Sequence, residues 1–213
     1  PEEFETAAET TGALILDTRS AATFCKAFVP RSINIGLDGQ FAPWVGAMVV
    51  DVKQPILLVT EEGKEEETLI RLSRVGFDVV YGFLKGGVEA WTSAGKDVDS
   101  VNRITADQFK SEITIGESFI LDVRKESEYR AEHVEEAYNK PLDFIGEWFM
   151  DMTSHEGEFY VHCAGGYRSM IAASVLKSKG IHNFKEVEGG FKAIAEAGVS
   201  KTDFVCQSKL QKA

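Results

Sequence analysis

An internal repeat constrains the fold of this chain more than any other feature of its sequence. Shifting the sequence by 105 positions places "EEFETAAETTGALILDTRSAATF" (2–24) on "DQFKSEITIGESFILDVRKESEY" (107–129). The shift falls to 103 where "GGVEAWTSAG" (86–95) meets "GGFKAIAEAG" (189–198). A period near 100 residues indicates duplicated domains, because solenoid repeats are about 20 to 50 residues long.

The repeat also suggests where the domains begin and end. We predict two domains, 1–98 and 99–213, because the segment "GKDVDSVN" (95–102) is polar and has no sustained apolar period. The second repeat opens with "VNRIT" (101–105), which we expect to supply a first strand and, at Thr105, a helix N-cap. The first repeat has no counterpart of this segment, so we expect the sequence to be a fragment of a longer polypeptide.

Apolar runs alternate with helical patterns in both repeats. The candidate strands are "LILDT", "PILLVT" and "DVVYGF" in the first repeat and "FILDV", "FYVHC" and "FKEVEGG" in the second. Helical patterns at 66–75 and 169–179 are each followed by a glycine. Continuous apolar strands between turns are typical of a parallel sheet that is covered on both faces. The predicted fold class is therefore α/β, with a parallel sheet flanked by helices in each domain.

Composition and charge exclude several classes of function. No apolar run approaches the roughly 20 residues of a membrane span, so we expect no membrane association. The net charge of −11 argues against nucleic-acid binding, which needs a basic surface. Cys25, Cys163 and Cys206 are odd in number and far apart, which predicts neither a disulfide framework nor a metal motif and favours a reducing cytoplasm. Cys25 and Cys206 lack a glycine loop and are interpreted as bystanders.

Cys163 has the sequence context of a reactive cysteine. It ends the run "FYVHC" and precedes "AGGYRSM", which places it at the carboxyl end of a parallel strand, where ligands bind in open sheets. Gly165 and Gly166 allow backbone N–H groups to face inward at the start of a helix. Together with Arg168, those donors favour a thiolate over a thiol, which makes Cys163 a candidate nucleophile. The alternative is that it is a small, inert core residue.

Three segments resemble the rhodanese homology domain, namely "LDVRKESEY", "VHCAGGYRSM" and the Gly-Gly pair near the end of the second repeat. The resemblance implies a sulfurtransferase in which Cys163 takes sulfane sulfur from thiosulfate or a low-molecular-weight persulfide. Cys163 then passes the sulfur to a sulfite, cyanide or thiol acceptor. The loop that would hold the persulfide and the anionic donor consists of Ala164, Gly165, Gly166, Tyr167, Arg168 and Ser169.

Sulfur transfer through a preformed thiolate needs no separate general base and no cofactor. The four histidines are therefore not required. We expect His162 to point to the face of the strand opposite Cys163, His133 to pack at a helix end, and His155 and His182 to lie in loops. No metal site is predicted, because no ligand spacing supports one.

An aspartate and an arginine recur in both repeats, as Asp17 and Arg19 and as Asp122 and Arg124. Because the first repeat has no cysteine at the equivalent point, catalysis alone cannot explain the recurrence. We interpret each set as a structural ion pair that ties a strand end to the following loop.

The first repeat has no nucleophile in the equivalent loop. Glu61 falls on Cys163, and the surrounding "EEGKEEE" would repel an anionic donor, so we predict an inactive first domain that supports the second or binds something else. "VPRSINIGLDGQFAPWVGAMV" and "GFDVVYGFLKGGVEAW" are similar to rhodanese segments fused behind a metallo-β-lactamase-type domain in bacterial persulfide-oxidising proteins. This resemblance implies such a domain upstream, with its metal ligands outside this chain.

Two other functions stay open. Rhodanese-like folds include dual-specificity phosphatases, whose similar loop has one more residue between cysteine and arginine. Four residues separate Cys163 from Arg168 here, which favours a cradle of the size of sulfur over that of phosphate. The second alternative is a docking or sulfur-sensing module without catalysis, in which Cys163 would stay unmodified.

Overall fold

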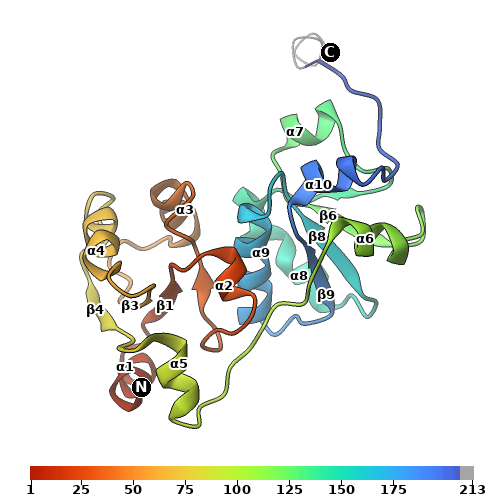
Figure 1. The fold of residues 1–213 in the computed structure, drawn as a ribbon. Coiled ribbons are helices and arrows are strands. Elements are labelled where there is room, and N and C mark those ends of the chain that lie inside the picture. The colour runs from red at the N-terminus through yellow and green to blue at the C-terminus, as the bar shows by residue number, and fades with distance from the viewer. Residues whose placement is uncertain (207–213) are drawn as a thin grey trace. The chain divides into compact units, whose positions relative to one another are not determined.

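The computed structural model describes residues 1–206 and shows two compact units, Pro1–Val101 and a second that begins at Asn102. Each unit contains one sheet in which all neighbouring strands are parallel. Helices lie on both faces of each sheet (Figure 1). The predicted α/β class is confirmed in both units.

The first unit is a four-stranded sheet in the order β2-β1-β3-β4. Its strands are β1 (Leu14–Asp17), β2 (Ile33–Asn34), β3 (Ile56–Val59) and β4 (Val80–Phe83). Its helices are α1 (Glu2–Thr11), α2 (Ala21–Phe24), α3 (Phe41–Met48), α4 (Glu65–Ser73) and α5 (Gly87–Ser93). Phe4 of α1 and Trp91 of α5 pack with Leu57 and Val59 on one face of the sheet.

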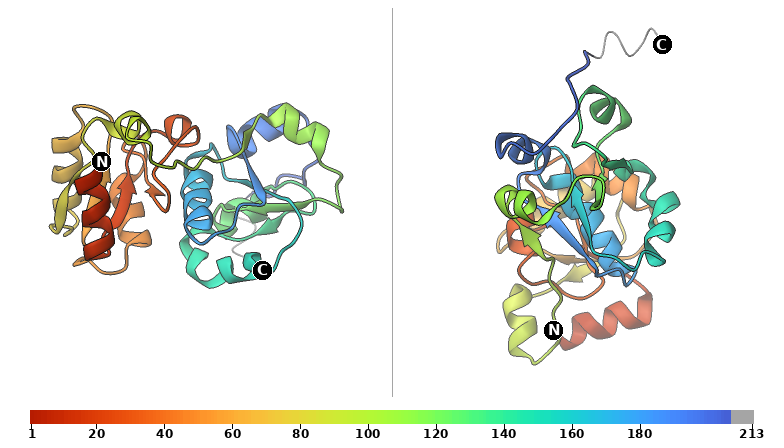
Figure 2. Two further views of the ribbon diagram at one scale, coloured as in Figure 1. Left: turned by 90° about the horizontal axis from the view of Figure 1, so that it is seen from below. Right: turned by 90° about the vertical axis from the view of Figure 1, so that its right-hand side faces the viewer.

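The second unit is a five-stranded sheet in the order β5-β9-β8-β6-β7. Its strands are β5 (Arg103–Ile104), β6 (Phe119–Asp122), β7 (Tyr138–Asn139), β8 (Phe159–His162) and β9 (Phe184–Val187). Its helices are α6 (Ala106–Glu112), α7 (Glu126–Ala131), the 3-10 turn η1 (Leu142–Phe144), α8 (Ile145–Thr153), α9 (Tyr167–Ser178) and α10 (Gly190–Glu196). Figure 2 shows the same elements from two further directions.

Local sequence signals set several of these helix ends. The Thr105 side chain accepts the Gln108 N–H, and the Gln108 side chain accepts the Thr105 N–H, so the predicted cap at α6 is a capping box. Gly180 follows α9 with a φ of 81°, in the left-handed region that favours glycine at a helix end. Both signals are short-range, which is why the sequence could supply them.

The two sheets differ at one edge. In the second unit, β5 pairs with β9, and Arg103 lies in register with Glu186. In the first unit, no strand among the described residues pairs with the outer side of β4, where Tyr81 and Phe83 are exposed. The predicted opening strand is therefore present in the second unit, and the first unit has no described counterpart.

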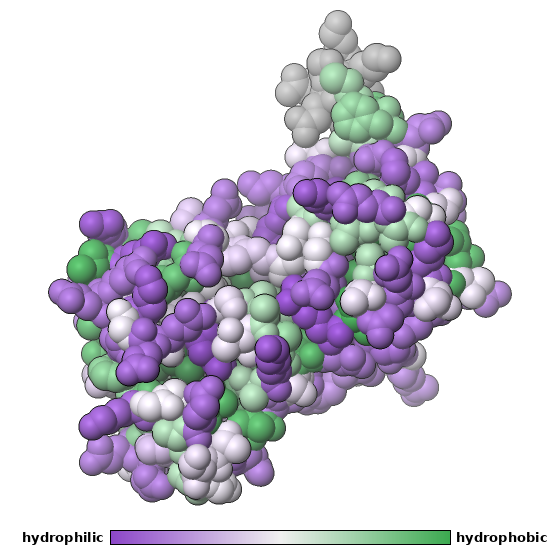
Figure 3. Space-filling view, viewed as in Figure 1, coloured by the Kyte–Doolittle hydropathy of each residue, from purple (hydrophilic) through white to green (hydrophobic). Residues whose placement is uncertain are grey.

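The surface is largely hydrophilic on the face drawn in Figure 3, with apolar side chains scattered over it. This is the distribution expected for a chain with a net charge of −11. None of the helices within residues 1–206 is both long enough and apolar enough to cross a membrane.

Candidate active site

Cys163 lies directly after β8 and four residues before α9 begins. Its side chain is buried, and its Sγ accepts a hydrogen bond from the Gly166 N–H at 3.2 Å. Gly166 has a φ of 98°, a conformation that glycine adopts without strain, and this turns its N–H toward the sulfur. The loop thus presents a backbone donor to the one atom that could carry sulfur.

The other loop residues surround the cysteine with different exposure. Gly165 at the tip is exposed, and Gly166 and Ser169 are buried. Half-buried positions between these extremes are Ala164, Tyr167 and Arg168. The exposed tip and the half-buried side chains form the part of the loop that solvent reaches, so a small donor would approach from that side.

The start of α10 holds the loop from behind. The Phe191 N–H donates to the Cys163 carbonyl at 2.6 Å, and the Lys192 N–H donates to the Ala164 carbonyl at 3.2 Å. Gly190 has a φ of 57°, and a Cβ at this position would lie 2.4 Å from the Cys163 oxygen. Only glycine permits this approach. The Gly-Gly pair noted in the sequence therefore lets the first amides of α10 bind the Cys163 and Ala164 carbonyls, while the Gly166 N–H faces the sulfur.

Arg168 is engaged by a carboxylate that the sequence analysis did not single out. Its Nη1 and Nη2 donate to the two oxygens of Glu128 on α7 at 2.6 and 2.9 Å. The hydrogen bond from Arg168 lowers the pKa of Glu128, and the same contact raises the pKa of Arg168. Arg168 was expected to bind the donor's anion directly; in the structure, its guanidinium joins the start of α9 to α7.

The repeated aspartate and arginine form a buried, bidentate pair in each unit. Arg124 Nη2 lies 2.6 Å from Asp122 Oδ2, and its Nε lies 2.9 Å from both carboxylate oxygens. Arg19 and Asp17 are joined with the same geometry, at 2.6 Å and 3.0 Å. The same Nη2 also donates to a backbone carbonyl eight residues further on, from Arg124 to Glu132 and from Arg19 to Ala27. The pair therefore fixes the loop that follows the strand.

His162 is the titratable side chain beside the cysteine. It is fully buried, lies in register with Asp122, and leaves its Nε2 without a hydrogen-bond partner. Burial lowers the pKa of His162, so the imidazole is neutral near neutral pH. Burial works against ionisation of Asp122, but the hydrogen bonds and the charge of Arg124 help to hold the pKa of Asp122 below its ordinary value.

The other histidines lie away from the loop. His133 stacks on Tyr129 just after α7, with ring centres 3.7 Å apart. His155 packs between Phe119 and Phe159. His182 lies in the turn before β9. Within residues 1–206, no group of three or more histidine, cysteine, aspartate or glutamate side chains could hold a metal ion.

The equivalent loop of the first unit has a different shape and charge. The strand register corrects the predicted equivalence of Glu61 with Cys163. Val59 lies opposite Asp17 as His162 lies opposite Asp122, so the buried Thr60, directly after β3, takes the place of Cys163. Glu61 is the next residue and is exposed, and the helix that follows begins with three glutamates. Lys64 occupies the place of Gly166 with a φ of −100°, and its ammonium pairs with Glu67 at 2.9 Å. This loop combines acidic side chains with a turn that differs from that of the cysteine loop.

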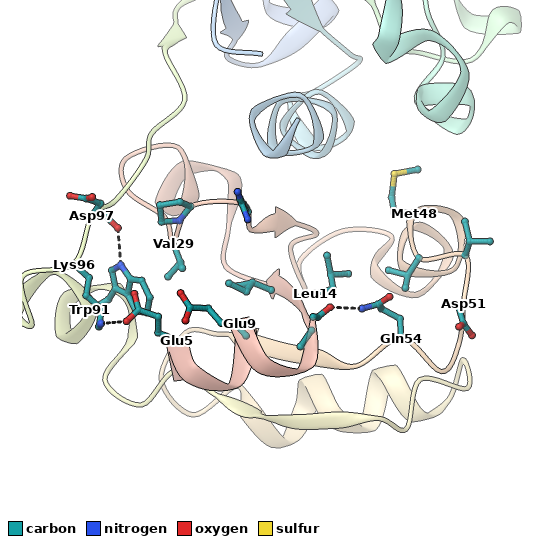
Figure 4. Close-up of a pocket in the computed structure, with 18 of the residues that line it drawn as sticks. Glu5, Glu9, Leu14, Val29, Met48, Asp51, Gln54, Trp91, Lys96 and Asp97 are labelled. Atoms are coloured by element: carbon teal, nitrogen blue, oxygen red, sulfur yellow. Dashed lines mark hydrogen bonds and ion pairs between the residues drawn. The ribbon is translucent and has the colours of Figure 1, made fainter. Parts of the chain in front are cut away.

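The first unit also contains a cavity of about 990 Å³ lined by α1, the start of β1 and the segments 29–31, 48–54 and 91–97 (Figure 4). Ala8, Ala13, Glu9 and Asp51 are among its lining residues. Trp91 borders it beneath Lys96, whose ammonium lies 5.2 Å from the ring centre. In the second unit, Ile113 stands where the first has Ala8 and packs against the core. The smaller Ala8 leaves space that Ile113 fills in the second unit, and the residues that line the cavity include no cysteine.

This fold and this loop define a protein built from two α/β domains, one with a cysteine at the carboxyl end of its central strand. The model of the rhodanese-like domain matches residues 1–94 and again 105–197, and the chain belongs to that family.

Two curated relatives are similar to part of the chain. YrkF of Bacillus subtilis, named as a sulfur carrier protein, is 30% identical over 111 residues, which are 52% of this chain and 56% of YrkF. The tRNA uridine(34) hydroxylase of Yersinia pestis is 32% identical over 92 residues, which are 41% of this chain and 26% of the hydroxylase. The chain therefore spans about half and about a quarter of these relatives.

Two solved structures are similar to parts or most of this chain. A rhodanese-related protein of Thermoplasma volcanium is 27% identical, with a TM-score of 0.43, and is matched over 47% of this chain and 97% of its own. The thiosulfate sulfurtransferase of Pseudomonas aeruginosa is 20% identical, with a TM-score of 0.41, over 95% of this chain and 43% of its own.

Three residues that support the loop were not expected from the sequence: Arg103, Glu128 and Glu186. A signal for Glu128 was available, because the first repeat has Thr23 at this place and Glu66 at the place of Arg168. The acid and the base are thus present together or absent together. Arg103 and Glu186 gave no such signal, because they are far apart in the chain and meet only through the pairing of β5 with β9.

Proposed function

We propose that the chain is a sulfurtransferase that moves sulfane sulfur from thiosulfate or a low-molecular-weight persulfide to a thiophilic acceptor through a persulfide on Cys163. The observation that carries the proposal is the Gly166 N–H, which donates to the Cys163 Sγ at 3.2 Å in a loop between β8 and α9. A hydrogen bond to an ionised group contributes about 1.5–3 kcal/mol, so this donor favours the thiolate that the reaction needs.

The reaction consists of two displacements at sulfur. The Cys163 thiolate attacks the outer sulfur of thiosulfate, a new S–S bond forms, and the old S–S bond breaks as sulfite leaves with its electron pair. A sulfite, cyanide or thiolate acceptor then attacks the terminal sulfur, and Cys163 returns as thiolate. Both steps start from an anionic nucleophile, so neither requires a proton to be removed. The neutral, buried His162 fits this scheme, which needs no base.

The loop's supports explain how the donor geometry is kept. Gly190 and the first amides of α10 hold the Cys163 and Ala164 carbonyls, and Arg168 holds α9 to α7 through Glu128. A preformed array of donors stabilises negative charge without reorganisation during the reaction. The persulfide anion would therefore meet the Gly166 amide, which is already turned toward the sulfur.

We further propose that the partners are small anionic sulfur donors and thiol or sulfite acceptors, and that a metallo-β-lactamase-type domain precedes these domains in the parent chain. The relative named as a sulfur carrier supports the first of these proposals, and the resemblance of the first repeat supports the second. The cysteines at positions 25, 163 and 206 are free thiols, which suits the cytoplasm.

The first domain is proposed to lack transfer activity. Thr60 stands in the place of the nucleophile, Glu61 follows it, and the acidic first turn of α4 repels an anionic donor. Its role is then to support the second domain or to bind another molecule.

The test is to treat the chain with thiosulfate and measure the intact mass, with Cys163→Ser as the control. We expect a gain of one sulfur that maps to Cys163, is removed by cyanide as thiocyanate, and is absent from the variant. Hydrolysis of an aryl phosphate without sulfur transfer would instead favour a phosphatase. An unmodified Cys163 under thiosulfate and under a thiol persulfide would favour a docking or sensing module.

A further inference from the structure

A buried charged network lies behind the cysteine loop and has no part in the two displacements. Its centre is Glu186 on β9, whose side chain is fully buried. One carboxylate oxygen accepts from Arg103 Nε on β5 at 2.7 Å, and the other accepts from Ser169 Oγ at the start of α9 at 2.5 Å. Burial raises the pKa of Glu186. A buried ion pair adds little to stability, because desolvation offsets the attraction between the charges. Stability alone therefore does not account for this network.

The network contacts the residue that supplies the donor to the sulfur. A Cβ on Gly166 would stand 3.0 Å from Arg103 Nη2 and 3.8 Å from Glu186 Oε1. The Gly166 N–H is the donor to the Cys163 Sγ. The guanidinium therefore packs directly against the residue whose amide faces the nucleophile.

The first domain provides a natural comparison, because two members of the network are replaced there. Phe83 stands in the place of Glu186 and Glu67 in the place of Ser169. Lys64 replaces Gly166, the residue that the network contacts. Glu186 and Ser169 thus accompany the cysteine, whereas the aspartate–arginine pairs occur in both domains.

We propose that Arg103 and Glu186 are positioning residues of the cysteine loop with opposite electrostatic effects, in which Arg103 stabilises the anionic sulfur through Gly166 and Glu186 holds Arg103 and moderates its charge. The inference deepens the proposed function and depends on it only for the identity of the anion. The opposite signs follow from Coulomb's law, because one group brings a positive and the other a negative charge to the same loop.

Other charged or titratable groups also face the loop and set the background against which these two act. They are Asp122 on β6 and Arg124 just after it, His162 on β8, Glu128 on α7, Arg168 on α9, and Glu188 just after β9. These groups are left unchanged in the experiment, so a difference between variants reports on Arg103 and Glu186.

The experiment is an ultraviolet titration of the Cys163 thiolate in the full chain, with Cys25 and Cys206 replaced by serine. The matching Cys163→Ser protein is subtracted at each pH. Arg103→Gln should raise the midpoint, and Glu186→Gln should lower it, each by about half a pH unit or more, while the double variant returns toward the parent. Arg103→Lys, which keeps the charge, should stay closer to the parent than Arg103→Gln.

Lys185→Gln is the matched control on the same strand. Lys185 pairs with Glu112 and Glu158, away from the loop, so this change should leave the midpoint in place. A purely structural network would move both test variants in the same direction or in neither, and either result would overturn the inference. If Glu186→Gln does not fold, equal midpoints for Arg103→Lys and Arg103→Gln would overturn it.

The readout separates this inference from the proposed function. The thiolate midpoint is measured without a sulfur donor, so opposite shifts support the inference even if thiosulfate fails to load Cys163. Sulfur loading with no shift in either variant would keep the sulfurtransferase proposal and remove the roles of Arg103 and Glu186.

Discussion

The two domains share a scaffold and differ in the loop that follows β3 in the first domain and β8 in the second. In both, a buried aspartate–arginine pair ties the first long strand to the next loop, and an asparagine side chain, Asn34 or Asn139, donates to the backbone of that strand end. After the central strand, one domain has Cys163 with a glycine turn, and the other has Thr60 and Glu61 with a lysine turn. The parts that both domains share therefore serve the fold, and the parts present once are those that the proposed chemistry uses.

The comparison also shows how many residues a reactive cysteine needs around it. The second domain alone has the glycine at Gly166, the Arg168–Glu128 pair and the Arg103–Glu186–Ser169 network. In the first domain, the positions equivalent to Gly166, Arg168, Glu128, Glu186 and Ser169 all have different residues.

The largest expected effect comes from moving the nucleophile between domains. Cys163→Ser should lower thiosulfate:cyanide transfer on the order of a thousandfold or more, because the covalent route is lost. Adding Thr60→Cys to this variant should restore nothing, because the Lys64 turn and the acidic α4 do not support a thiolate. Transfer rates and the intact mass check both statements, and a sulfur on position 60 would break the comparison.

The shared ion pairs should matter for stability in both domains. Asp122→Asn and Asp17→Asn each leave a buried guanidinium without its carboxylate, which costs about 3–5 kcal/mol. Hydrogen exchange measured by mass spectrometry should show lost protection of β6 in the first variant and of β1 in the second. Sulfur transfer should fall only with Asp122→Asn. Equal loss of transfer in the two variants would mean that the first domain takes part in the reaction.

The Gly-Gly pairs give a matched test of the loop geometry. Gly190→Ala places a Cβ 2.4 Å from the Cys163 carbonyl oxygen, and the equivalent Gly87→Ala meets only the Glu89 carboxylate at 3.1 Å. We expect Gly190→Ala to lower sulfur loading about tenfold or more, because backbone strain of about 1–3 kcal/mol falls on the loop. Gly87→Ala should cost about 1 kcal/mol of stability for its positive φ and leave transfer intact. Equal transfer in the two variants would contradict the role given to α10.

The smallest effect is expected from the cavity in the first domain. Ala8→Ile introduces the side chain that the second domain has at Ile113 and fills part of the space beside Ala13. We expect a gain of about 1 kcal/mol, since apolar area is removed from water. Denaturant unfolding with hydrogen exchange on α1 measures it. Destabilisation would show that the cavity walls cannot accept the larger side chain.

Much of the fold was predictable because its signals are local or repeated. Apolar runs predicted the strands, and Thr105 predicted the start of α6 through a contact three residues long. The recurrence of Asp17–Arg19 at Asp122–Arg124 predicted a pair whose members are two residues apart. Such pairs need no knowledge of the tertiary fold, because the chain itself brings the partners together.

The supports of the candidate site were not predictable in the same way. Arg168 meets Glu128 across 40 positions, and Arg103 meets Glu186 across 83. From a single sequence, each of these residues would be expected on the surface, since charged side chains are mostly exposed. The role of Arg168 toward the donor's anion was expected from the family resemblance, and the structure adds that its guanidinium is paired with Glu128.

The sequence by itself determined that the chain contains two α/β domains, that one of them has a cysteine before a glycine turn, and that the other has no cysteine in its equivalent loop. Only the tertiary structure decided which side chains surround that cysteine. The reason is physical: strand pairing and helix packing bring distant residues within hydrogen-bond distance, and whether the sulfur is held as an anion depends on those neighbours.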